Sequence, residues 1–377
     1  MRDPDLLVVG GGPSGLAAAM AARQLGMSVT VVEARRGSID KACGEGIMPS
    51  GVAALRELGI AGLDGLPFVG IRYELASRDD CAAEGDFSGG YGLGVRRTEL
   101  SAAMRDRAEE LGVGFAYRTV REVRQHRGGV SAAGLWAPHL IAADGLRSTV
   151  RRRLGLEMPS PAPRRFGVVR HLSTPPWTDR VVVMLGSQAE AYVTPVAEDQ
   201  IGVAMLHRNP RDRFDDLLPG FPTLAARVNG ASALGPDRGA GPFDQRVRRR
   251  VAGRVLLVGD AAGYVDPLTG EGIALGMRTA RAAVECIAQG KVRRYEAIHR
   301  TITRRYYTMT RALLAVVARP WLHRPLIRVA GASRALFGYV LDELDGDASR
   351  MPGPSSPGPT VPTRAFGRAV ETGRVTC

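Results

Sequence analysis

The stretch that decides the fold lies near the N-terminus, where the apolar run Leu6–Val9 (LLVV) leads directly into the glycine-rich run Gly10–Gly15 (GGGPSG). The residues Leu16–Leu25 are good helix formers, and Gly26 follows them at a position typical of a helix end. A second apolar run, Val29–Val32 (VTVV), comes next. Strand, glycine turn, helix and strand in this order predict a complete β-α-β unit.

The glycine turn follows the G-x-G-x-x-G spacing of a dinucleotide fingerprint. Gly10 would allow a tight turn, Gly12 would let the backbone approach a pyrophosphate, and Gly15 would let the helix pack closely on the strand. The helix would begin at the phosphates, where its free N–H groups and its dipole favour anions. Glu33 ends the second strand and is placed to accept a hydrogen bond from a ribose hydroxyl. The expected dinucleotide contacts of this unit are Gly10, Gly12, Pro13, Ser14, Gly15, Glu33 and Ala34.

Two later motifs indicate which dinucleotide is bound. Ala142–Arg151 (AADGLRSTVR) resembles the DG motif, and Gly259–Ala274 (GDAAGYVDPLTGEGIA) resembles the GD motif, of a large superfamily of FAD-dependent oxidoreductases. This superfamily is of the p-hydroxybenzoate hydroxylase type and also holds geranylgeranyl reductases and flavin-dependent halogenases. The resemblance runs from Leu6 to about Gln289, with three motifs in the same order. It implies a non-covalently bound FAD that NADH or NADPH reduces, with no separate domain for the nicotinamide nucleotide.

The resemblance also implies roles for single residues. In such proteins the Asp that matches Asp260 bonds the ribityl chain, and the turn that matches Gly270–Ile273 lies against the isoalloxazine ring. A helix opening near Gly272 would point free N–H groups at the flavin edge where negative charge collects on reduction. Arg97 matches an arginine that contacts FAD, and a solvated arginine at a helix start is the alternative. The motifs add Cys43, Gly44, Arg97, Asp144, Gly145, Asp260, Pro267, Gly270, Gly272 and Ile273 to the expected cofactor contacts.

The loop Lys41–Pro49 (KACGEGIMP) resembles the Cys-Gly loop of geranylgeranyl reductases. Within it, Cys43 and Glu45 are the candidate catalytic residues, Cys43 as a thiol beside the flavin and Glu45 as an acid/base group. Two structural alternatives stay open. Cys43 can be a small residue packed under the ring, and Glu45 can be a loop carboxylate paired with an arginine. A halogenase is disfavoured because the sequence lacks a Trp-x-Trp-x-Ile-Pro element.

A different pattern of short strand-like runs, separated by turns, lies between residues 166 and 206. Such a pattern predicts an antiparallel sheet laid over a ligand. His171 and His207 fall on this sheet, where an imidazole could handle a phenol proton, but we expect both to face solvent. The four runs are Val168–Leu172, Val181–Leu185, Ala191–Val196 and Ile201–Leu206.

Two activities fit these motifs. The predicted sheet lacks the Tyr-x-Trp-x-Phe-Pro element of the reductases and has only Tyr192–Pro195 (YVTP). This difference favours an FAD-dependent monooxygenase that uses NAD(P)H and O₂ to hydroxylate an aromatic, polyketide or phenolic-lipid substrate. The alternative, which the Cys43 loop favours, is a geranylgeranyl-reductase-like flavoprotein that reduces C=C bonds of a prenyl or other lipophilic substrate. The sequence therefore predicts a flavoenzyme for a small aromatic or lipophilic molecule, with the monooxygenase preferred.

The predicted fold is α/β, a Rossmann-like FAD-binding domain of the GR2 type with an inserted antiparallel β-sheet domain for the substrate and a C-terminal helical segment. The tail is expected to be disordered because it is rich in Pro and Gly. The expected parts are 1–62, 98–155 and 246–290 for the FAD-binding domain, 63–97 and 156–245 for the substrate domain, 291–345 for the basic helical segment and 346–377 for the tail.

The charge of the chain is concentrated near its C-terminus. The 377 residues carry a formal net charge of +13, and the segment from Lys291 to Arg334 holds eleven basic residues against one acid. No zinc finger or aromatic-basic repeat accompanies this charge, so we expect no nucleic-acid partner. Apolar residues alternate with the arginines over residues 291–340, which predicts helices with one apolar and one cationic face. Such a face either packs on the FAD-binding domain, with solvated arginines, or contacts an anionic membrane.

The sequence shows no signal peptide and no charge-free apolar run of eighteen residues, so we expect a cytoplasmic protein, with peripheral contact at the inner face of the membrane as the further option. Four cysteines lie far apart with no CxxC spacing. This spacing argues against a disulfide framework and a structural zinc site, and we expect no metal.

Overall fold

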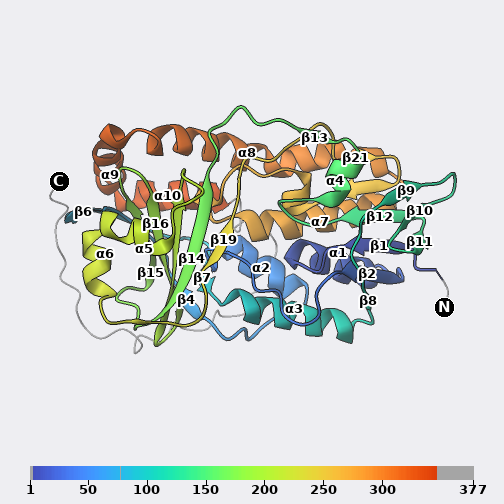
Figure 1. Ribbon diagram of the computed structural model, residues 1–377, viewed down its shortest axis with the longest axis horizontal. Coiled ribbons are helices and arrows are strands. Elements are labelled where there is room, and N and C mark those ends of the chain that lie inside the picture. Colours follow the sequence, from blue (N-terminus) through green and yellow to red (C-terminus); the bar gives the residue numbers. More distant parts are fainter. Residues whose placement is uncertain (1–2, 77, 346–377) are drawn as a thin grey trace.

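The N-terminal β-α-β unit lies at the centre of a six-stranded sheet (Figure 1). The computed structural model describes residues 3–76 and 78–345, so the expected disordered tail, residues 346–377, lies outside the described residues. The strands of this sheet are β1 Leu6–Val9, β2 Val29–Glu33, β8 Gly114–Tyr117, β12 His139–Ala142, β21 Val251–Ala252 and β22 Val255–Leu257. Their order is β21-β22-β12-β1-β2-β8, and all pairs are parallel except β21–β22.

Helices cover one face of this sheet, and a small β-meander covers the other. Along β1, Leu6 and Val8 point to the helices, whereas Leu7 and Val9 point to the meander. Because both faces of β1 are buried, its sequence is apolar throughout rather than alternating. The covering elements are α1 Pro13–Gln24, α3 Arg97–Glu110 and α7 Gly272–Ala288 on the first face, and β9 Val123–Gln125, β10 Val130–Ala132, β11 Leu135–Ala137 and α4 Thr149–Arg153 on the second.

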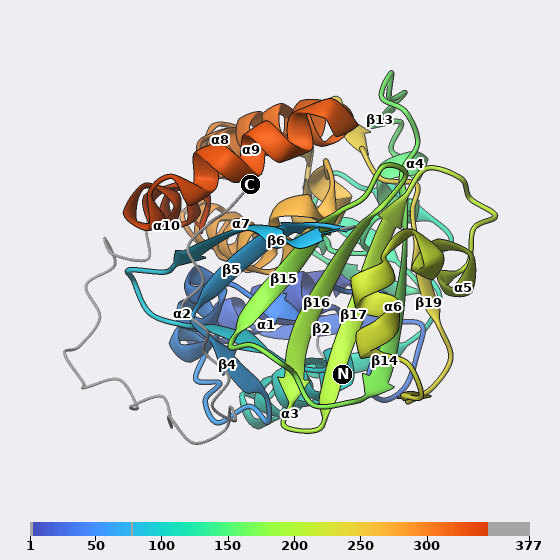
Figure 2. The same ribbon diagram turned by 90° about the vertical axis from the view of Figure 1, so that its left-hand side faces the viewer.

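A second sheet lies beside the first and is antiparallel except for one parallel pair, β5–β15. Its strands are β5 Gly70–Leu75, β6 Arg78–Asp86, β14 Phe166–Ser173, β15 Arg180–Leu185, β16 Glu190–Ala197, β17 Gln200–His207, β18 Ser232–Ala233 and β19 Arg238–Ala240. Their order is β18-β14-β17-β16-β15-β5-β6, with β19 on β14. The four predicted runs are confirmed as β14 to β17. Helices α5 (Phe214–Leu217) and α6 (Pro222–Arg227) cover its outer face (Figure 2).

Short elements fill the space around the two sheets. A three-stranded sheet in the order β3-β7-β4 lies against β16. The remaining elements are β3 Gly46–Ile47, α2 Pro49–Glu57, β4 Leu66–Phe68, β7 Gly92–Gly94, β13 Glu157–Met158 paired with β20 Arg246–Val247, and the 3₁₀ turns η1 Leu218–Gly220, η2 Gly259–Ala262, η3 Pro267–Thr269, η4 Val292–Arg294 and η5 Pro320–Leu322.

The expected C-terminal helical segment is confirmed. α8 (Tyr295–Val317) runs along the molecule, and α9 (His323–Gly331) and α10 (Arg334–Asp345) pack over the β6 edge of the second sheet (Figures 1 and 2). Their apolar residues Ile327, Phe337 and Leu341 are buried there. No helix among the described residues is both long and apolar enough to cross a membrane.

A buried ion cluster joins the two sheets. Arg165, just before β14, donates from Nε to Asp266 Oδ2 at 2.9 Å and from Nη2 to Glu190 Oε2 at 2.6 Å. Asp266 belongs to the GD motif and is 1% exposed. Burial raises the pKa of Asp266 to about 6, although the Arg165 guanidinium opposes this shift. One arginine therefore pairs with two buried carboxyl groups that come from different parts of the fold.

Replacing Arg165 by Met should destabilise the protein by about 3–5 kcal/mol, because two carboxylates stay buried without a cation. The folded-state pKa of Asp266 lies above its unfolded value of 3.8, so the carboxyl favours the folded state when protonated and this contribution is lost as the pH rises through about 6. The Arg165→Met variant should accordingly lose more of its free energy of unfolding at about pH 8 than at about pH 5.

Urea unfolding at the two pH values measures this effect. The neighbouring Arg164 is exposed, so Arg164→Met is the matched control and should change little. An Arg165→Met variant as stable as this control would contradict the proposed role of the ion cluster.

Candidate cofactor site

The three fingerprint glycines have different surroundings. Gly10 has φ +105°, and a Cβ there would lie 2.4 Å from the backbone oxygen of Ala143. A Cβ on Gly15 would lie only 1.8 Å from the backbone oxygen of Gly10. A Cβ on Gly12, in contrast, would meet nothing nearer than Arg97 Nη2, at 3.9 Å. Gly10 and Gly15 are therefore required by the packing of the protein itself, whereas Gly12 keeps an open approach for another molecule.

The first turn of α1 leaves its N–H groups available. The helix starts at Pro13 and has no side-chain cap, so its first N–H groups have no partner in the helix. The Ser14 side chain points away from this end, because a Cβ on Gly259 or Gly276 would come within 2.4 or 2.3 Å of its Oγ. Ser14 can therefore offer a ligand only its backbone N–H, while its side chain fits α1 against the GD motif and α7.

The carboxylate of Glu33 is held beside the glycine turn. Its Oε2 accepts a hydrogen bond from Gly11 N at 2.7 Å, and its Oε1 accepts one from Arg35 N at 3.0 Å. Ala34 follows at an exposed position. A carboxylate oxygen has a second lone-pair site, so Glu33 keeps acceptor capacity for a ribose hydroxyl at this place.

Arg97 at the start of α3 is 7% exposed, so the alternative of a solvated arginine is wrong. Its Nη1 is buried and has no hydrogen-bond partner among the described residues. The guanidinium lies beside Gly12 and the open end of α1. A buried guanidinium without a partner is costly unless an anion joins it. The glycine turn, the helix start and Arg97 thus have the open space and the donors that an anion such as a pyrophosphate requires.

Glu45 is buried in the loop before β3 and has φ +58°, an uncommon conformation for a residue other than glycine. Its Oε1 accepts a hydrogen bond from Arg97 N at 2.7 Å, and its Oε2 lies 2.7 Å from His171 Nε2. Arg96 Nε lies 3.7 Å from Oε1. Glu45 therefore lies near an arginine side chain, as one alternative predicts. Its second partner is His171, which was expected to face solvent.

Neither histidine of the second sheet faces solvent, and that expectation is wrong. His171 is 8% exposed and is held by Glu45, and His207 is 3% exposed. Burial lowers the pKa of His207, whose Nδ1 lies 2.9 Å from the backbone oxygen of Asn209. Side chains alternate between the two faces of a strand, so Arg170 and His171 of β14 lie on opposite faces. This alternation was the sequence signal that His171 is buried.

Cys43 and Gly44 are fixed between the sheets. Cys43 is a free thiol whose Sγ accepts a hydrogen bond from Glu45 N at 3.4 Å. Burial raises the pKa of this thiol, so it stays protonated at neutral pH. The backbone oxygen of Gly44 accepts a hydrogen bond from Thr194 Oγ1 at 2.8 Å, which ties the loop to β16.

The same loop meets the DG and GD motifs. Lys41 Nζ lies 3.9 Å from Asp260 Oδ2 and would lie 3.3 Å from a Cβ on Gly145. Asp260 is partly exposed at the edge of the GD turn. Loop, DG motif and GD motif, which are far apart in the sequence, are therefore neighbours in the fold.

Asp144 has a structural role in its own loop. Its two oxygens accept hydrogen bonds from Ser148 Oγ at 2.5 Å and Val150 N at 3.0 Å. Arg151, which the sequence reasoning did not single out, is completely buried and donates to the backbone oxygens of Asp260 and Ala261, each at 3.3 Å. Arg151 therefore joins the DG motif to the GD motif, and a charged residue directly after the apolar Val150 was its only sequence signal.

The GD motif continues into α7 through Gly270, which has φ +75° and follows the 3₁₀ turn that Pro267 begins. Gly272 and Ile273 then start α7, which has no side-chain cap. The neighbouring Glu271 is 5% exposed, and its Oε1 has no partner among the described residues. Burial raises the pKa of Glu271 to about 8, so a neutral carboxyl stands beside the free N–H groups of the helix.

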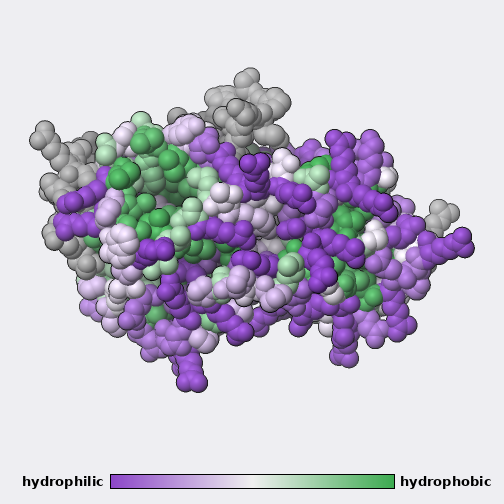
Figure 3. Space-filling view, turned by 90° about the horizontal axis from the view of Figure 1, so that it is seen from above, coloured by the Kyte–Doolittle hydropathy of each residue, from purple (hydrophilic) through white to green (hydrophobic). Residues whose placement is uncertain are grey.

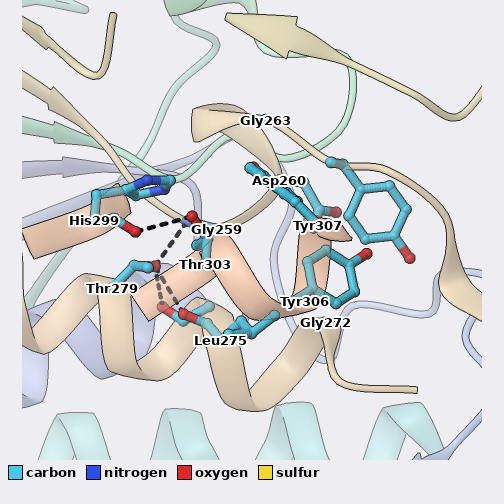
Figure 4. Close-up of a pocket in the computed structure, with 12 residues that line it drawn as sticks. Gly259, Asp260, Gly263, Gly272, Leu275, Thr279, His299, Thr303, Tyr306 and Tyr307 are labelled. Carbon is cyan, nitrogen blue, oxygen red and sulfur yellow. Dashed lines mark hydrogen bonds between the residues drawn. The ribbon is translucent and has the colours of Figure 1, made fainter. Parts of the chain in front are cut away.

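A small cavity of about 20 Å³ lies behind this turn, between α7 and α8 (Figure 4). It has room for a single water molecule and is far too small for a flavin. Gly259 N donates to Thr279 Oγ1 at 3.3 Å in its wall. The cavity therefore lies within the packing that supports the GD turn. Its walls are formed by Gly259, Asp260, Gly263, Tyr264, Gly272, Leu275, Gly276, Thr279, His299, Thr303, Tyr306 and Tyr307.

The structure brings most of the predicted contacts to one region. The open glycine turn, the uncapped starts of α1 and α7, and the unpaired guanidinium of Arg97 are the features that a dinucleotide with a pyrophosphate and a reducible ring requires. These residues fit FAD. Among residues 3–76 and 78–345, no group of three His, Cys, Asp or Glu side chains could hold a metal ion. Cys81 is disulfide-bonded, so the argument from cysteine spacing does not hold for this residue.

The different surroundings of the glycines predict opposite effects of two substitutions. Gly12→Val should leave the apoprotein as stable as the wild type but free of flavin, because the side chain fills the open approach. Gly15→Ala should destabilise the apoprotein by roughly 1–3 kcal/mol, since its Cβ meets backbone. Flavin absorbance per protein and urea unfolding of the apoproteins test both effects. Full flavin occupancy in Gly12→Val would show that the phosphates bind elsewhere.

Comparison with known proteins agrees with this geometry. Residues 3–291 match the model of a family described as FAD binding domain. The chain is 30% identical over 330 residues to a menaquinone reductase of Mycolicibacterium smegmatis, covering 80% of this chain and 81% of that protein. It is 28% identical over 315 residues to a digeranylgeranylglycerophospholipid reductase of Methanoculleus marisnigri (76% and 78% covered) and 26% identical over 314 residues to a rifampicin monooxygenase of Rhodococcus hoagii (73% and 62% covered).

Among solved structures, a flavoprotein/dehydrogenase from Cytophaga hutchinsonii has the same fold, with a TM-score of 0.80 at 18% identity over 92% of this chain and 93% of that chain. The family match covers the β-α-β unit, the DG motif and the GD motif together. The chain therefore belongs to the family of the FAD-binding domain, and it is an FAD-dependent oxidoreductase of the superfamily that holds p-hydroxybenzoate hydroxylase and the geranylgeranyl reductases.

Proposed function

We propose that the protein reduces a C=C bond of a lipophilic, isoprenoid-type molecule, with NADH or NADPH as the source of electrons. The observation that carries this proposal is the loop of Cys43 and Glu45, which resembles that of geranylgeranyl reductases and lies between the GD motif and the second sheet. The identity to a menaquinone reductase and to a digeranylgeranylglycerophospholipid reductase supports it. These observations support the reductase, whereas the missing Tyr-x-Trp-x-Phe-Pro element supports the monooxygenase.

The bound FAD, once reduced, supplies a hydride equivalent. The glycine turn, Arg97 and Asp260 hold the cofactor in this proposal, and the thiol of Cys43 holds the proton that the second carbon of the double bond needs. Burial keeps this thiol protonated. One hydride and one proton add across the double bond, NAD(P)H is oxidised to NAD(P)⁺, and the thiolate regains a proton from solvent. Glu45 is a positioning residue, because it holds Arg97 and the loop.

The side of the second sheet near this loop is apolar and packs against the loop and the GD motif. Tyr73, Val181 and Val183 lie on the face that packs toward Met48 and Leu268. These side chains are buried against one another, so they form a packed apolar surrounding for the loop. The hydroxyl of Tyr192, on neighbouring β16, is buried without a partner among the described residues, and it can donate a hydrogen bond to the polar end of a substrate.

The second candidate is the monooxygenase that the sequence reasoning preferred, with NAD(P)H and O₂ and an aromatic, polyketide or phenolic-lipid substrate. The identity to a rifampicin monooxygenase favours it, as does the YVTP sequence at Tyr192. The two activities differ in their need for oxygen, which makes them separable by experiment.

Turnover of menaquinone and of a digeranylgeranyl lipid, with FAD and NADPH or NADH, should proceed under strict exclusion of O₂ and give a product heavier by two hydrogen atoms, measured by mass spectrometry. Cys43→Ala should lower kcat by about a hundredfold, the usual contribution of a proton donor, and should keep its flavin. Cys286→Ala, at the second free thiol, is the control. A product that forms only in air and carries one additional oxygen atom would support the monooxygenase instead.

A further inference from the structure

Large apolar side chains gather on the outer side of the last helices. Trp321 is 72% exposed, Val329 67%, Tyr339 62% and Leu336 55%. These residues lie on η5, α9 and α10, and we refer to them as the outer face. Figure 3 shows apolar side chains gathered at the end of the molecule where α9 and α10 lie, bordered by hydrophilic ones. Monomeric proteins seldom expose such a patch unless it contacts something.

The fold does not need the outer face for its own core. Ile327, on the opposite side of α9, is completely buried, and His323 Nε2 lies 2.9 Å from the backbone oxygen of Val317. Phe337 and Leu341 of α10 are buried in the same cluster. Each helix therefore has one apolar side in the core and carries further apolar residues outside.

The charge around the outer face is mainly positive, although Asp342 and Glu343 follow at the end of α10. From residue 297 to residue 341 the sequence has eight arginines and no Asp or Glu. Arg319 and Arg324 are exposed beside Trp321. Arg334 is engaged by Glu84 and Asp86, at 3.2 Å each, so its charge is partly compensated. The partner of this face must therefore accept apolar side chains and supply negative charge.

We propose that the outer face rests on the surface of an anionic lipid bilayer. Trp and Tyr side chains have their preferred place at the interface between water and lipid, and arginines around them attract anionic headgroups. A second copy of this chain is a poor partner, because two outer faces would bring like charges together. A nucleic acid would supply negative charge but no apolar surface for Val329 and Leu336.

The helices of the outer face also reach the cofactor region. Asp345, at the end of α10, accepts hydrogen bonds from Ser50 N at 2.9 Å and Ser50 Oγ at 2.5 Å, which ties α10 to α2. Phe337 and Leu341 share a cluster with Met48 and Leu268, beside the candidate catalytic loop and in the GD motif. The outer face is thus joined to the cofactor region by one packed apolar cluster, close to the place where a lipophilic substrate would meet the flavin. Only this last step rests on the proposed function.

Sedimentation of the full-length holoprotein with vesicles tests the proposal without any turnover. Vesicles of phosphatidylglycerol and phosphatidylcholine should retain most of the protein at low salt and release it at high salt, because salt screens the arginines. Vesicles of phosphatidylcholine alone should retain at least fivefold less. Trp321→Ala combined with Val329→Ser, and separately Arg319→Gln combined with Arg324→Gln, should each reduce the bound fraction at least fivefold.

Trp136→Ala and Arg152→Gln are matched controls, because both residues are exposed at the other end of the molecule. They should bind vesicles like the wild type. Equal sedimentation with both kinds of vesicle, or full binding by the Trp321 and Val329 variant, would overturn the proposal. A concentration-dependent dimer that this variant abolishes would assign the outer face to a second copy instead. A failure to reduce C=C bonds would leave vesicle binding unaffected, so the two proposals fail separately.

Discussion

The close contact between the start of α1 and the turn after β22 is the constraint on which the rest of the site depends. The contact is made by backbone and by one small side chain, since Ser14 fills the space between Gly259 and Gly276, and Gly15 lies against the backbone oxygen of Gly10. Side chains at these glycines would separate the two segments. Because β1 and β22 are parallel members of one sheet, their carboxyl ends open on the same edge. The helices α1 and α7, which start near this edge, both lack a side-chain cap, as a site for one dinucleotide would require.

The second sheet is connected to this edge by buried polar contacts. Arg165 joins Glu190 of β16 to Asp266 of the GD motif, and Glu45 joins Arg97 to His171 of β14. Polar groups at such depth are stable only when they are paired, so these contacts fix how the sheet is placed relative to the GD motif and the start of α3. The thiol of Cys43, which we propose as the proton donor, lies on the loop that these contacts hold.

The parts of the fold that depend on local sequence could be predicted. The β-α-β unit and the four strands from β14 to β17 follow from apolar runs and turn residues, which act within a few positions. Contacts between distant segments could not be predicted in this way. His171 is buried because it meets Glu45, 126 residues away, and Asp144 serves its own loop because Ser148 and Val150 turn back on it. The fingerprint alone also did not show that Gly12 has open space where a side chain would lie, whereas Gly10 and Gly15 are packed against backbone.

We infer that the glycine turn, the start of α1 and Arg97 form one anion cradle for the pyrophosphate of FAD. The dissociation constant of FAD from the apoprotein, measured by quenching of flavin fluorescence, tests it most directly in Arg97→Met. A charged hydrogen-bond donor contributes about 1.5–3 kcal/mol, so binding should weaken about tenfold or more. Arg124→Met, at an exposed arginine of β9, should bind FAD like the wild type. An Arg97→Met variant with unchanged affinity would contradict the account.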